Sequence, residues 1–268
     1  MSLRFLRSRV EIFGESFSSI VYRYHGEETV LKAPEIWIDG KGYERKRYEQ
    51  DLELEDKIYK VIGEHPNIIK SLGLETIGPG VQALRLERAT SGCVRARVLR
   101  DSPPPMAKRL RMCHDYANAM AHLHAKGVIW NDPSPRNALL FGDRLKICDF
   151  GLSFVEGCDD YDQTCCHSPR SEVPPRGRAR KDIPPVLREL FALGSAIFEI
   201  TEWRIPFHDI GNERLYVVQE MVADDKLSPI SDENPARDII RRCRDEEYGS
   251  AQAIAGDLEE LMARLDAA

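Results

Sequence analysis

The local pattern of the sequence changes about one third of the way along the chain, and this change limits the folds that are open to it. Short runs rich in β-branched and aromatic residues fill roughly the first ninety residues, with one long helical stretch among them. From Ser102 onward the spacing of apolar residues is mostly helical. A chain of 268 residues is long for one compact core. The sequence therefore predicts an α+β protein with a β-rich lobe followed by an α-rich lobe and a boundary near residues 87–92.

The expected elements follow from these patterns. In the first part we expect one helix at 43–62 and strands at 10–13, 20–24, 29–33, 68–72 and 81–86. The second part is expected to open with a helix that Ser102 caps and that stops at Gly127. We expect strands at 128–130, 138–141 and 145–148, and helices at 186–201, 214–223, 235–244 and 251–263. The Pro- and Arg-rich stretch 168–185 is expected to be a loop.

Composition narrows the class of protein. The net charge of −6 argues against a nucleic-acid binder, which is usually basic. The longest apolar run, 190–198, is too short to span a bilayer, and no apolar signal region is found at the start. Seven cysteines in such a chain favour reduced thiols. We therefore expect a cytoplasmic or nuclear protein without a nucleic-acid or membrane partner; the sequence is silent on oligomeric state.

Three polar residues that follow one another along the chain have the composition of a phosphate and magnesium site. Asp132 and Asn137 are separated by four residues between two expected strands, and Asp149 ends the next strand in Asp149-Phe150-Gly151. One carboxylate can orient a hydroxyl, while a second carboxylate and an amide oxygen can hold Mg²⁺ on phosphate oxygens. Each residue alone would suit an ordinary turn. The three together favour the site.

A lysine and a glutamate form a candidate ion pair. Lys32 lies near the end of the expected third strand, and Glu55 is the single charge on a helical face that also contains Tyr48, Leu52, Tyr59 and Ile62. A charge on a face that packs against the core needs a partner, and Lys32 is the candidate. A solvated Glu55 at the edge of that face is the alternative.

These motifs, in this order, resemble those of eukaryotic protein kinases over nearly the whole chain. Val30-Leu31-Lys32 resembles the strand-lysine motif, and Asp149-Phe150-Gly151 resembles the Asp-Phe-Gly element. The stretches 65–69, 87–89, 123–129 and 191–194 resemble further kinase segments. The Asp-x-Ser-x-x-Asn loop at 132–137 is most similar to divergent kinases common in filamentous fungi.

The resemblance implies a site and its ligands. It implies one kinase domain, 1–268, with a small N-lobe at 1–87 and a larger C-lobe at 88–268, that uses ATP and Mg²⁺ to phosphorylate protein hydroxyls. The implied catalytic residues are Asp132, Lys32, Glu55 and Arg136, and the implied metal ligands are Asn137 and Asp149. The implied nucleotide-binding residues are Phe13, Gly14, Val21, Lys32, Leu86, Glu87, Ala89 and Leu139.

The glycine-rich loop departs from the family pattern. Only Gly14 remains, and Ser16 and Ser19 stand where the other glycines would be. Glycine lets the backbone approach phosphates closely, and serine does so less freely. We therefore expect weaker, but not absent, ATP binding.

The catalytic loop also departs from the pattern. Asn131 replaces an arginine that pairs with a phosphorylated activation loop, so we expect activity that does not require this phosphorylation. Ser134 replaces a lysine, and Arg136 is expected to supply its charge. Glu189 stands where an aspartate is usual, and Arg176 ends a weak counterpart of Ala-Pro-Glu. The family's Ser/Thr kinases are the leading model, possible dual specificity included.

Two other functions remain open. A pseudokinase scaffold would explain the eroded glycine loop, and a small-molecule phosphotransferase of related fold would share the Asp-x-x-x-x-Asn loop. We set aside a zinc site formed by Cys158, Cys165, Cys166 and His167, because C-x₂₋₄-C spacing is absent. His122 and His124 point to different faces of a helix. We interpret the basic run 176–181 as a solvated face rather than a phosphate site.

Overall fold

The computed structural model describes residues 10–15, 20–24, 26–33, 42–78, 81–157 and 168–267. Their contacts divide the chain into two compact units. The first unit contains the described residues up to His65, together with Ile69–Ala89 and Asp149–Gly151. The second contains Pro66–Ile68, Thr90–Cys148 and the described residues from Leu152 onward. The first unit carries a β-sheet and the second is mostly helical, as the α+β expectation required.

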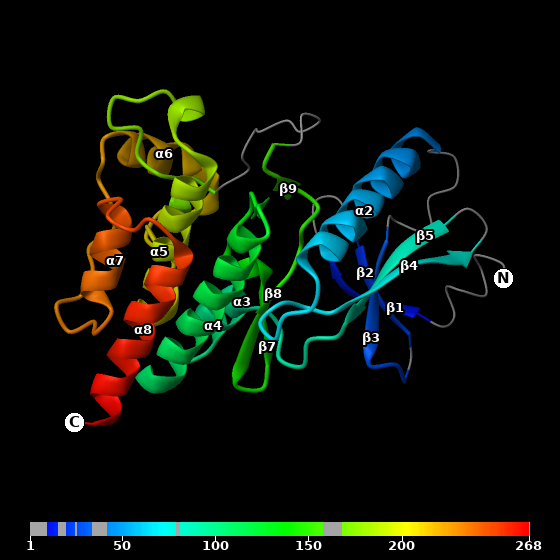
Figure 1. The fold of residues 1–268 in the computed structure, drawn as a ribbon, viewed down its shortest axis with the longest axis horizontal. Helices are drawn as coiled ribbons and strands as arrows, with labels where there is room; N and C mark the ends of the chain where they lie inside the picture. Colours follow the sequence, from blue (N-terminus) through cyan, green and yellow to red (C-terminus); the bar gives the residue numbers. More distant parts are fainter. Residues whose placement is uncertain are drawn as a thin grey trace. The chain divides into compact units, whose positions relative to one another are not determined.

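The first unit is a five-stranded antiparallel sheet with one long helix against it (Figure 1). The strand order is β1-β2-β3-β5-β4, so the central strand β3 lies between β2 and β5. The bounds are β1 (Val10–Glu15), β2 (Ile20–Tyr24), β3 (Thr29–Ala33), α2 (Gly42–Ile62), β4 (Ser71–Gly78) and β5 (Val81–Glu87). Lys32 pairs with Val21 on one side and Leu84 on the other.

The predicted inner face of α2 is confirmed where the structure describes it. Leu52, Glu55, Tyr59 and Ile62 are all buried, while the side chain of Tyr48 lies outside the described part. The helix ends as expected at Gly63, whose φ of 70° is left-handed and whose N–H donates to the carbonyl of Tyr59 (3.0 Å). The helical spacing of apolar residues in the sequence therefore correctly predicted that Glu55 is buried.

The strand expected at 68–72 is wrong at its start. β4 begins only at Ser71, because Ile68 forms a parallel bridge with Ile147 and belongs to the second unit. Ile68 and Ile69 are buried, but a buried apolar pair does not by itself identify its sheet partner. Gly73, at φ 91°, lies where the pairing of β4 with β5 shifts register.

The second unit follows the predicted order of elements with changed ends. Its helices are α3 (Val94–Arg100), α4 (Met106–Ala125), α5 (Pro185–Glu202), α6 (Leu215–Ala223), α7 (Arg237–Arg244) and α8 (Ala251–Asp266). Its strands are β6 (Val128–Ile129), β7 (Ala138–Phe141), β8 (Arg144–Ile147) and β9 (Phe154–Val155). Short 3₁₀ turns are η1 (Pro135–Asn137), η2 (Pro169–Ser171), η3 (Arg180–Asp182) and η4 (Asn212–Arg214). α4 packs against both α5 and α8 (Figure 1). The sequence did not predict α3 or β9.

The expected helix cap at Ser102 is wrong. Three prolines follow Ser102, and a residue before proline is disfavoured in the helical region. The chain therefore stays extended through Pro105, and α4 begins at Met106. The end agrees with the prediction, since Gly127 follows α4 with a φ of 68°.

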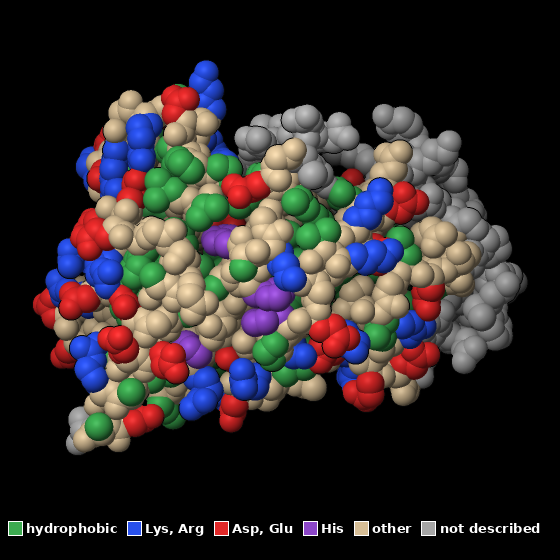
Figure 2. All heavy atoms as spheres, in the orientation of Figure 1, with side chains coloured by type: hydrophobic (Ala, Val, Ile, Leu, Met, Phe, Trp, Pro, Cys, Tyr) green, Lys and Arg blue, Asp and Glu red, His purple; other side chains and the backbone are tan. Residues whose placement is uncertain are grey.

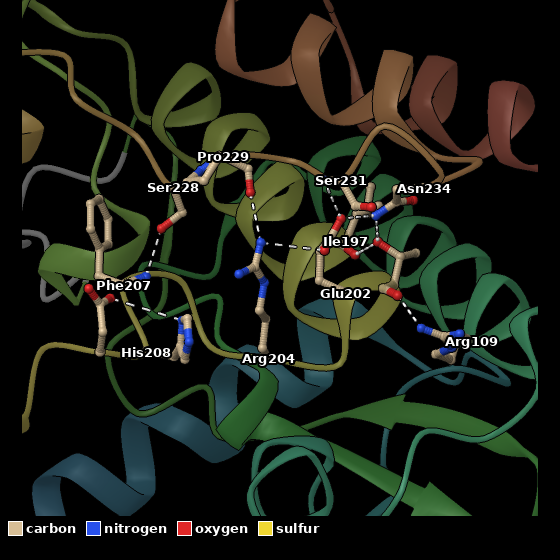
Figure 3. A network of polar contacts seen from close by, with 12 residues as sticks. Arg109, Ile197, Glu202, Arg204, Phe207, His208, Ser228, Pro229, Ser231 and Asn234 are labelled. Carbon is tan, nitrogen blue, oxygen red and sulfur yellow. Dashed lines mark hydrogen bonds and ion pairs between the residues drawn. The ribbon is translucent and has the colours of Figure 1, made fainter.

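Helix α5 lies in the core of the second unit, and a polar network fastens its C-terminal end (Figure 3). The side-chain amide of Asn234 donates to Thr201 Oγ1 (3.0 Å) and to Glu202 Oε1 (2.7 Å). Arg204, just beyond the helix, donates to the carbonyl of Pro229 (2.9 Å). These bonds satisfy polar groups that burial would otherwise leave unmatched.

The charges of the second unit are mixed in sign on the face shown in Figure 2. Lys and Arg side chains lie interspersed with Asp and Glu over the part that Figure 1 shows as α5 to α8. Among the described helices, α5 included, none has the length and apolar character needed to cross a bilayer.

Candidate active site

Lys32, Glu55 and Asp149 meet in the first unit. The Nζ atom of Lys32 donates to Glu55 Oε2 (2.7 Å) and to Asp149 Oδ1 (2.6 Å). The Glu55 side chain is 1% exposed and that of Lys32 9%, whereas Asp149 is 36% exposed. The ion pair expected from the helix face is therefore present, and the solvated alternative for Glu55 is excluded. The buried Glu55 carboxylate fixes the position of the Lys32 ammonium, and the Asp149 carboxylate is partly exposed to solvent.

Burial and charge oppose each other in this cluster. Burial alone would lower the pKa of the Lys32 ammonium, but Asp149 and Glu55 raise it above its ordinary value. Burial raises the pKa of the Glu55 carboxyl, and the Lys32 ammonium opposes that rise. Lys32 is thus held as a cation, which is the form that can bind phosphate oxygens.

The Asp149-Phe150-Gly151 turn is fixed to α2. Asp149 is left-handed, with φ 66°, and the next N–H, of Phe150, donates to Glu55 Oε1 (3.1 Å). The Phe150 ring is fully buried and lies edge-on to Tyr59, with centroids 5.0 Å apart. Glu55 therefore positions both the lysine and the turn that carries Asp149.

Asp132 and Asn137 meet in the second unit. The side-chain amide of Asn137 donates to Asp132 Oδ2 (2.9 Å) and to its carbonyl (3.1 Å). The hydroxyl of Ser134 accepts from the N–H of Arg136 (3.3 Å) and caps η1. The small turn thus fixes the two polar side chains, while Arg136 is exposed.

Glu189 holds the loop from beneath, a role that sequence reasoning missed. Its Oε1 accepts from the N–H of Asn131 (2.6 Å), and its Oε2 lies 2.8 Å from His124 Nε2. Asn131 is left-handed, with φ 67°, and its amide donates to the carbonyl of Leu152 (3.1 Å). The available signals were a glutamate in a largely apolar helix and a histidine in the last turn of another helix. His124 is therefore a structural partner of the loop.

Trp130 supports the same loop through packing. Its ring is fully buried and lies 5.7 Å from that of Tyr116, between centroids. Its carbonyl accepts from the hydroxyl of Ser153 (2.9 Å). Trp130 therefore has an apolar packing role next to the loop.

The residues expected to bind nucleotide lie on both units. Phe13 and Gly14 are in β1, Val21 is in β2, and Leu86 and Glu87 end β5, with Ala89 just beyond. Leu139 lies in β7 of the second unit. Leu86 and Ala89 are buried, and Phe13 is 46% exposed. Glu87 binds Lys70 in both directions, since its N–H donates to that residue's carbonyl (3.0 Å) and its Oε2 accepts from that residue's N–H (3.2 Å).

Several sequence candidates fall elsewhere. Ser16, Ser19, Cys158, Cys165, Cys166 and His167 lie outside the described residues. The basic run beginning at Arg176 is not merely solvated, because Arg176 binds Asp225 (2.9 Å) and Arg178 binds Glu246 (2.6 Å). Its charges are therefore largely used in ion pairs.

A protein-family model identifies the family of this chain. The model described as protein tyrosine and serine/threonine kinase matches residues 38–248, which is most of the chain. The chain belongs to the protein kinase family. The family model runs from before α2 to beyond α7 and so includes Glu55, Asp132, Asn137 and Asp149.

The relatives are kinases by name. A Dictyostelium discoideum protein named as a probable myosin light chain kinase is 29% identical over 69% of this chain and 60% of its own length. The serine/threonine-protein kinase RUNKEL of Arabidopsis thaliana is 26% identical over 80% of this chain and 15% of its own. The hormonally up-regulated neu tumor-associated kinase of Mus musculus is 28% identical over 76% of this chain and 28% of its own length. The chain thus spans between 15% and 60% of the length of the curated relatives described here.

Asp149 in the first unit and Asn137 in the second each carry a side-chain oxygen of the kind that Mg²⁺ prefers. Within the described ranges, no group of three or more His, Cys, Asp or Glu side chains forms a complete cage for a metal. Magnesium commonly takes one or two protein oxygens and completes its shell with water and phosphate. Asp149 offers a part-exposed carboxylate, and Asn137 uses its amide nitrogen on Asp132, which leaves its amide oxygen as a ligand.

Proposed function

We propose that this chain transfers the γ-phosphate of ATP to serine or threonine hydroxyls of proteins, tyrosine being a possible further acceptor. The observation that carries the proposal is the double engagement of Lys32 by Glu55 and Asp149. A cation fixed in this way costs little reorganisation when it meets phosphate oxygens. The names of the relatives support Ser/Thr specificity. We propose residues 1–268 as one kinase domain, with lobes at 1–87 and 88–268.

In this proposal, each polar side chain has a defined role in the transfer. Lys32 would bind the α- and β-phosphates, and Asp149 and Asn137 would hold Mg²⁺, which would supply charge neutralisation to the phosphates. Asp132 orients the substrate hydroxyl and accepts its proton as the hydroxyl oxygen bonds to the γ-phosphorus. The bond from that phosphorus to the β–γ bridging oxygen breaks, and ADP leaves with the electron pair. Arg136 offsets charge on the phosphoryl group.

The adenine site is proposed at the end of β5. Phe13, Val21, Leu86 and Leu139 would supply apolar contacts, with Gly14 over the phosphates. The carbonyl of Glu87 and the N–H of Ala89 would bond the base edge. The N–H of Glu87 donates to the carbonyl of Lys70, which fixes the backbone at the end of β5.

The test is transfer of labelled γ-phosphate by the purified protein, with Mg²⁺ and generic protein substrates. We expect incorporation into serine or threonine, a loss of at least about 100-fold in Asp132→Asn, and a comparable loss in Asp149→Ala. Glu55→Gln should lose activity, whereas Glu53→Gln, an exposed change on the same helix, should not.

The other two functions predict different results. A scaffold would show no incorporation above Asp149→Ala, and its partner binding would survive Asp132→Asn. A small-molecule phosphotransferase would label a small acceptor but no protein. Either result would contradict the proposal.

A further inference from the structure

Three arginines of the second unit lie on α3 and on two short turns that pack against α3 or α5, and α5 carries a buried carboxylate. Arg95 lies on α3, Arg136 on η1, Arg170 on η2 and Glu199 on α5. Helix α3 packs against both η1 and α5, and α5 packs against η2. The Glu199 side chain is 1% exposed. We call these four residues the arginine cluster.

Arg95 occupies both oxygens of the carboxylate. Its Nη2 donates to Glu199 Oε2 (2.5 Å), and its Nε donates to Oε1. In such a bidentate pair, each carboxylate oxygen accepts one charge-assisted hydrogen bond. Glu199 therefore offers little to a basic side chain that arrives from outside.

Neither Arg170 nor Arg136 forms an ion pair with a carboxylate among the residues that the structure describes. Burial lowers the pKa of the Arg170 guanidinium, and the negative charges of Glu199 and Asp209 oppose this. Arg170 is buried and donates to the carbonyls of Pro206 (2.8 Å), Phe207 (2.7 Å) and Ile210 (2.6 Å), and to Asn212 Oδ1 (3.3 Å). Carbonyl and amide oxygens satisfy its N–H groups but carry no net charge. The exposed guanidinium of Arg136 makes no hydrogen bond or ion pair with any residue that the structure describes.

The cluster therefore carries three positive charges and one negative charge. Burial raises the pKa of the Glu199 carboxyl, and Arg95, Arg136 and Arg170 oppose that rise. Arg95 binds Glu199 directly, Arg136 lies on η1, which packs against α3, and Arg170 lies on η2, which packs against α5. An excess of positive charge remains, and Arg136 is its solvent-facing member.

The position of Arg136 in the sequence indicates which molecule could bind to this positive charge. It directly precedes Asn137, whose amide binds the Asp132 carboxylate. In an extended peptide, a residue two positions from the phosphorylated one is about 7 Å away, within the reach of an arginine side chain.

We propose that the arginine cluster recognises an anionic side chain, carboxylate or phosphate, within about three residues of the phosphorylated position in the substrate. This inference rests on the proposed kinase function, because it assumes that a substrate hydroxyl reaches Asp132. It makes Arg136 a specificity-determining residue.

The test uses a set of peptides that differ at single positions around one serine. Each flanking position in turn carries glutamate, phosphoserine, glutamine or lysine. Binding is measured by fluorescence anisotropy without ATP, and relative kcat/KM is measured with ATP. The proteins are the wild type, Arg136→Gln and Arg264→Gln, the last being the same charge change on an exposed site of α8.

At one or more positions, we expect the wild type to prefer glutamate or phosphoserine over glutamine by about fivefold, and lysine least. Arg136→Gln should reduce this ratio to below about twofold, and Arg264→Gln should leave it unchanged. The glutamate and phosphoserine arms decide which anion is preferred. Added salt should weaken the preference, because Arg136 is exposed.

The two proposals fail in different ways. Equal binding of all peptides, a preference for lysine, or identical behaviour of the two variants would overturn the anionic subsite even if every peptide were phosphorylated. Absence of phosphorylation with an intact binding preference would overturn the kinase function and leave the subsite standing.

Discussion

Glu189 is the residue on which the backbone of the candidate catalytic loop depends most directly. It is fully buried in α5, and its two oxygens serve two partners, the N–H of Asn131 and the ring of His124. Asn131 is held left-handed, a conformation that costs free energy for a residue with a side chain. The carboxylate therefore offsets a local strain next to Asp132.

We expect Glu189→Gln to weaken both folding and turnover. The amide nitrogen cannot accept a hydrogen bond, so one of the two buried donors loses its partner, at a cost of about 1–3 kcal/mol. Urea unfolding would measure the stability, and kcat would report on the loop. Glu259→Gln, exposed on α8, is the matched control. Equal stability of the two variants would contradict this role.

Asn131 itself argues for activity without phosphorylation of the activation segment. Its side chain is turned inward, with the residue 3% exposed and its amide bonded to Leu152. A buried neutral amide cannot form the ion pair with phosphate that an arginine makes. We expect phosphatase treatment, checked by intact mass, to change turnover by less than about twofold. A large loss would show that another group binds the phosphate.

Sequence reasoning at this scale succeeded where the signal was local. Glu55 stands out as the single charge on a helical period, and its partner Lys32 is the lysine of a buried strand. Glu189 acts on Asn131, 58 residues away in sequence, and no periodicity connects them. The carboxylate of Glu199 and its three arginines are hidden for the same reason.

The approach of helix α5 to helix α7 depends on the absence of a side chain. A Cβ atom at Gly194 would lie 2.3 Å from the Cβ of Cys243, much closer than two carbons can come. Since Cβ is part of every other residue, no rotamer change at Cys243 relieves this overlap. The helices would have to move apart.

Gly194→Ala should therefore destabilise the protein by about 1–3 kcal/mol through overpacking. Gly256→Ala is the matched control, because it also adds one methyl group to a helix but meets nothing within 4 Å. We expect that change to be neutral or to stabilise by up to about 1 kcal/mol, since alanine is the better helix former. Chemical denaturation of both variants compares them. A stable Gly194→Ala would mean that α5 and α7 pack more loosely.

Ion pairs fasten the segment before α5 to the loops after α6 and α7. Arg176 binds Asp225 and Glu246, and Arg178 binds Glu246 through both terminal guanidinium nitrogens (2.6 and 2.8 Å). The bond from Arg178 lowers the pKa of the Glu246 carboxyl, while partial burial opposes this. A lowered pKa means that ionised Glu246 favours the folded state.

This contribution should be present near neutral pH and disappear in acid. We expect the wild type to unfold at higher urea concentration than Glu246→Gln at pH 7. The difference should shrink as the pH falls below about 4.3, because the unfolded carboxyl binds a proton there before the folded one does, and it should also shrink as salt is added. A difference that is constant from pH 7 to pH 3 would show that charge is not its cause.

At the scale of the whole molecule, two cysteines can report the unfolding of the second unit. Cys113 in α4 and Cys243 in α7 are buried, and burial raises the pKa of both thiols above the ordinary range. Cys93 and Cys148 are partly exposed.

We expect alkylation at pH 8 to label Cys93 and Cys148 in the native protein but to reach Cys113 and Cys243 only after unfolding. A raised pKa leaves little thiolate, and burial excludes the reagent, so both effects act in the same direction. Peptide mapping by mass spectrometry in increasing urea would follow each site. Early labelling of Cys243 alone would show that α7 opens before the rest of the unit.

The order of elements could be read from the sequence, but the assignment of two short segments to their units could not. The change from strand to helical patterns gave a boundary near Glu87, close to the end of the main part of the first unit at Ala89. Residues 66–68 belong to the second unit and residues 149–151 to the first, because their contacts are made with segments far away in the chain. Composition carries no signal of such exchanges.

This exchange of segments means that the protein cannot be dissected by a single cut. A fragment that stopped at Ala89 would keep Lys32 and Glu55 but lose Asp149 and the Phe150 ring that covers Tyr59. The remaining fragment would lose Asn67, whose amide caps the carbonyl of Leu145 (3.1 Å). Each fragment would lack residues that complete its own contacts, because those residues lie on the other fragment. Point substitutions in the intact chain are therefore the way to separate the roles of the two units.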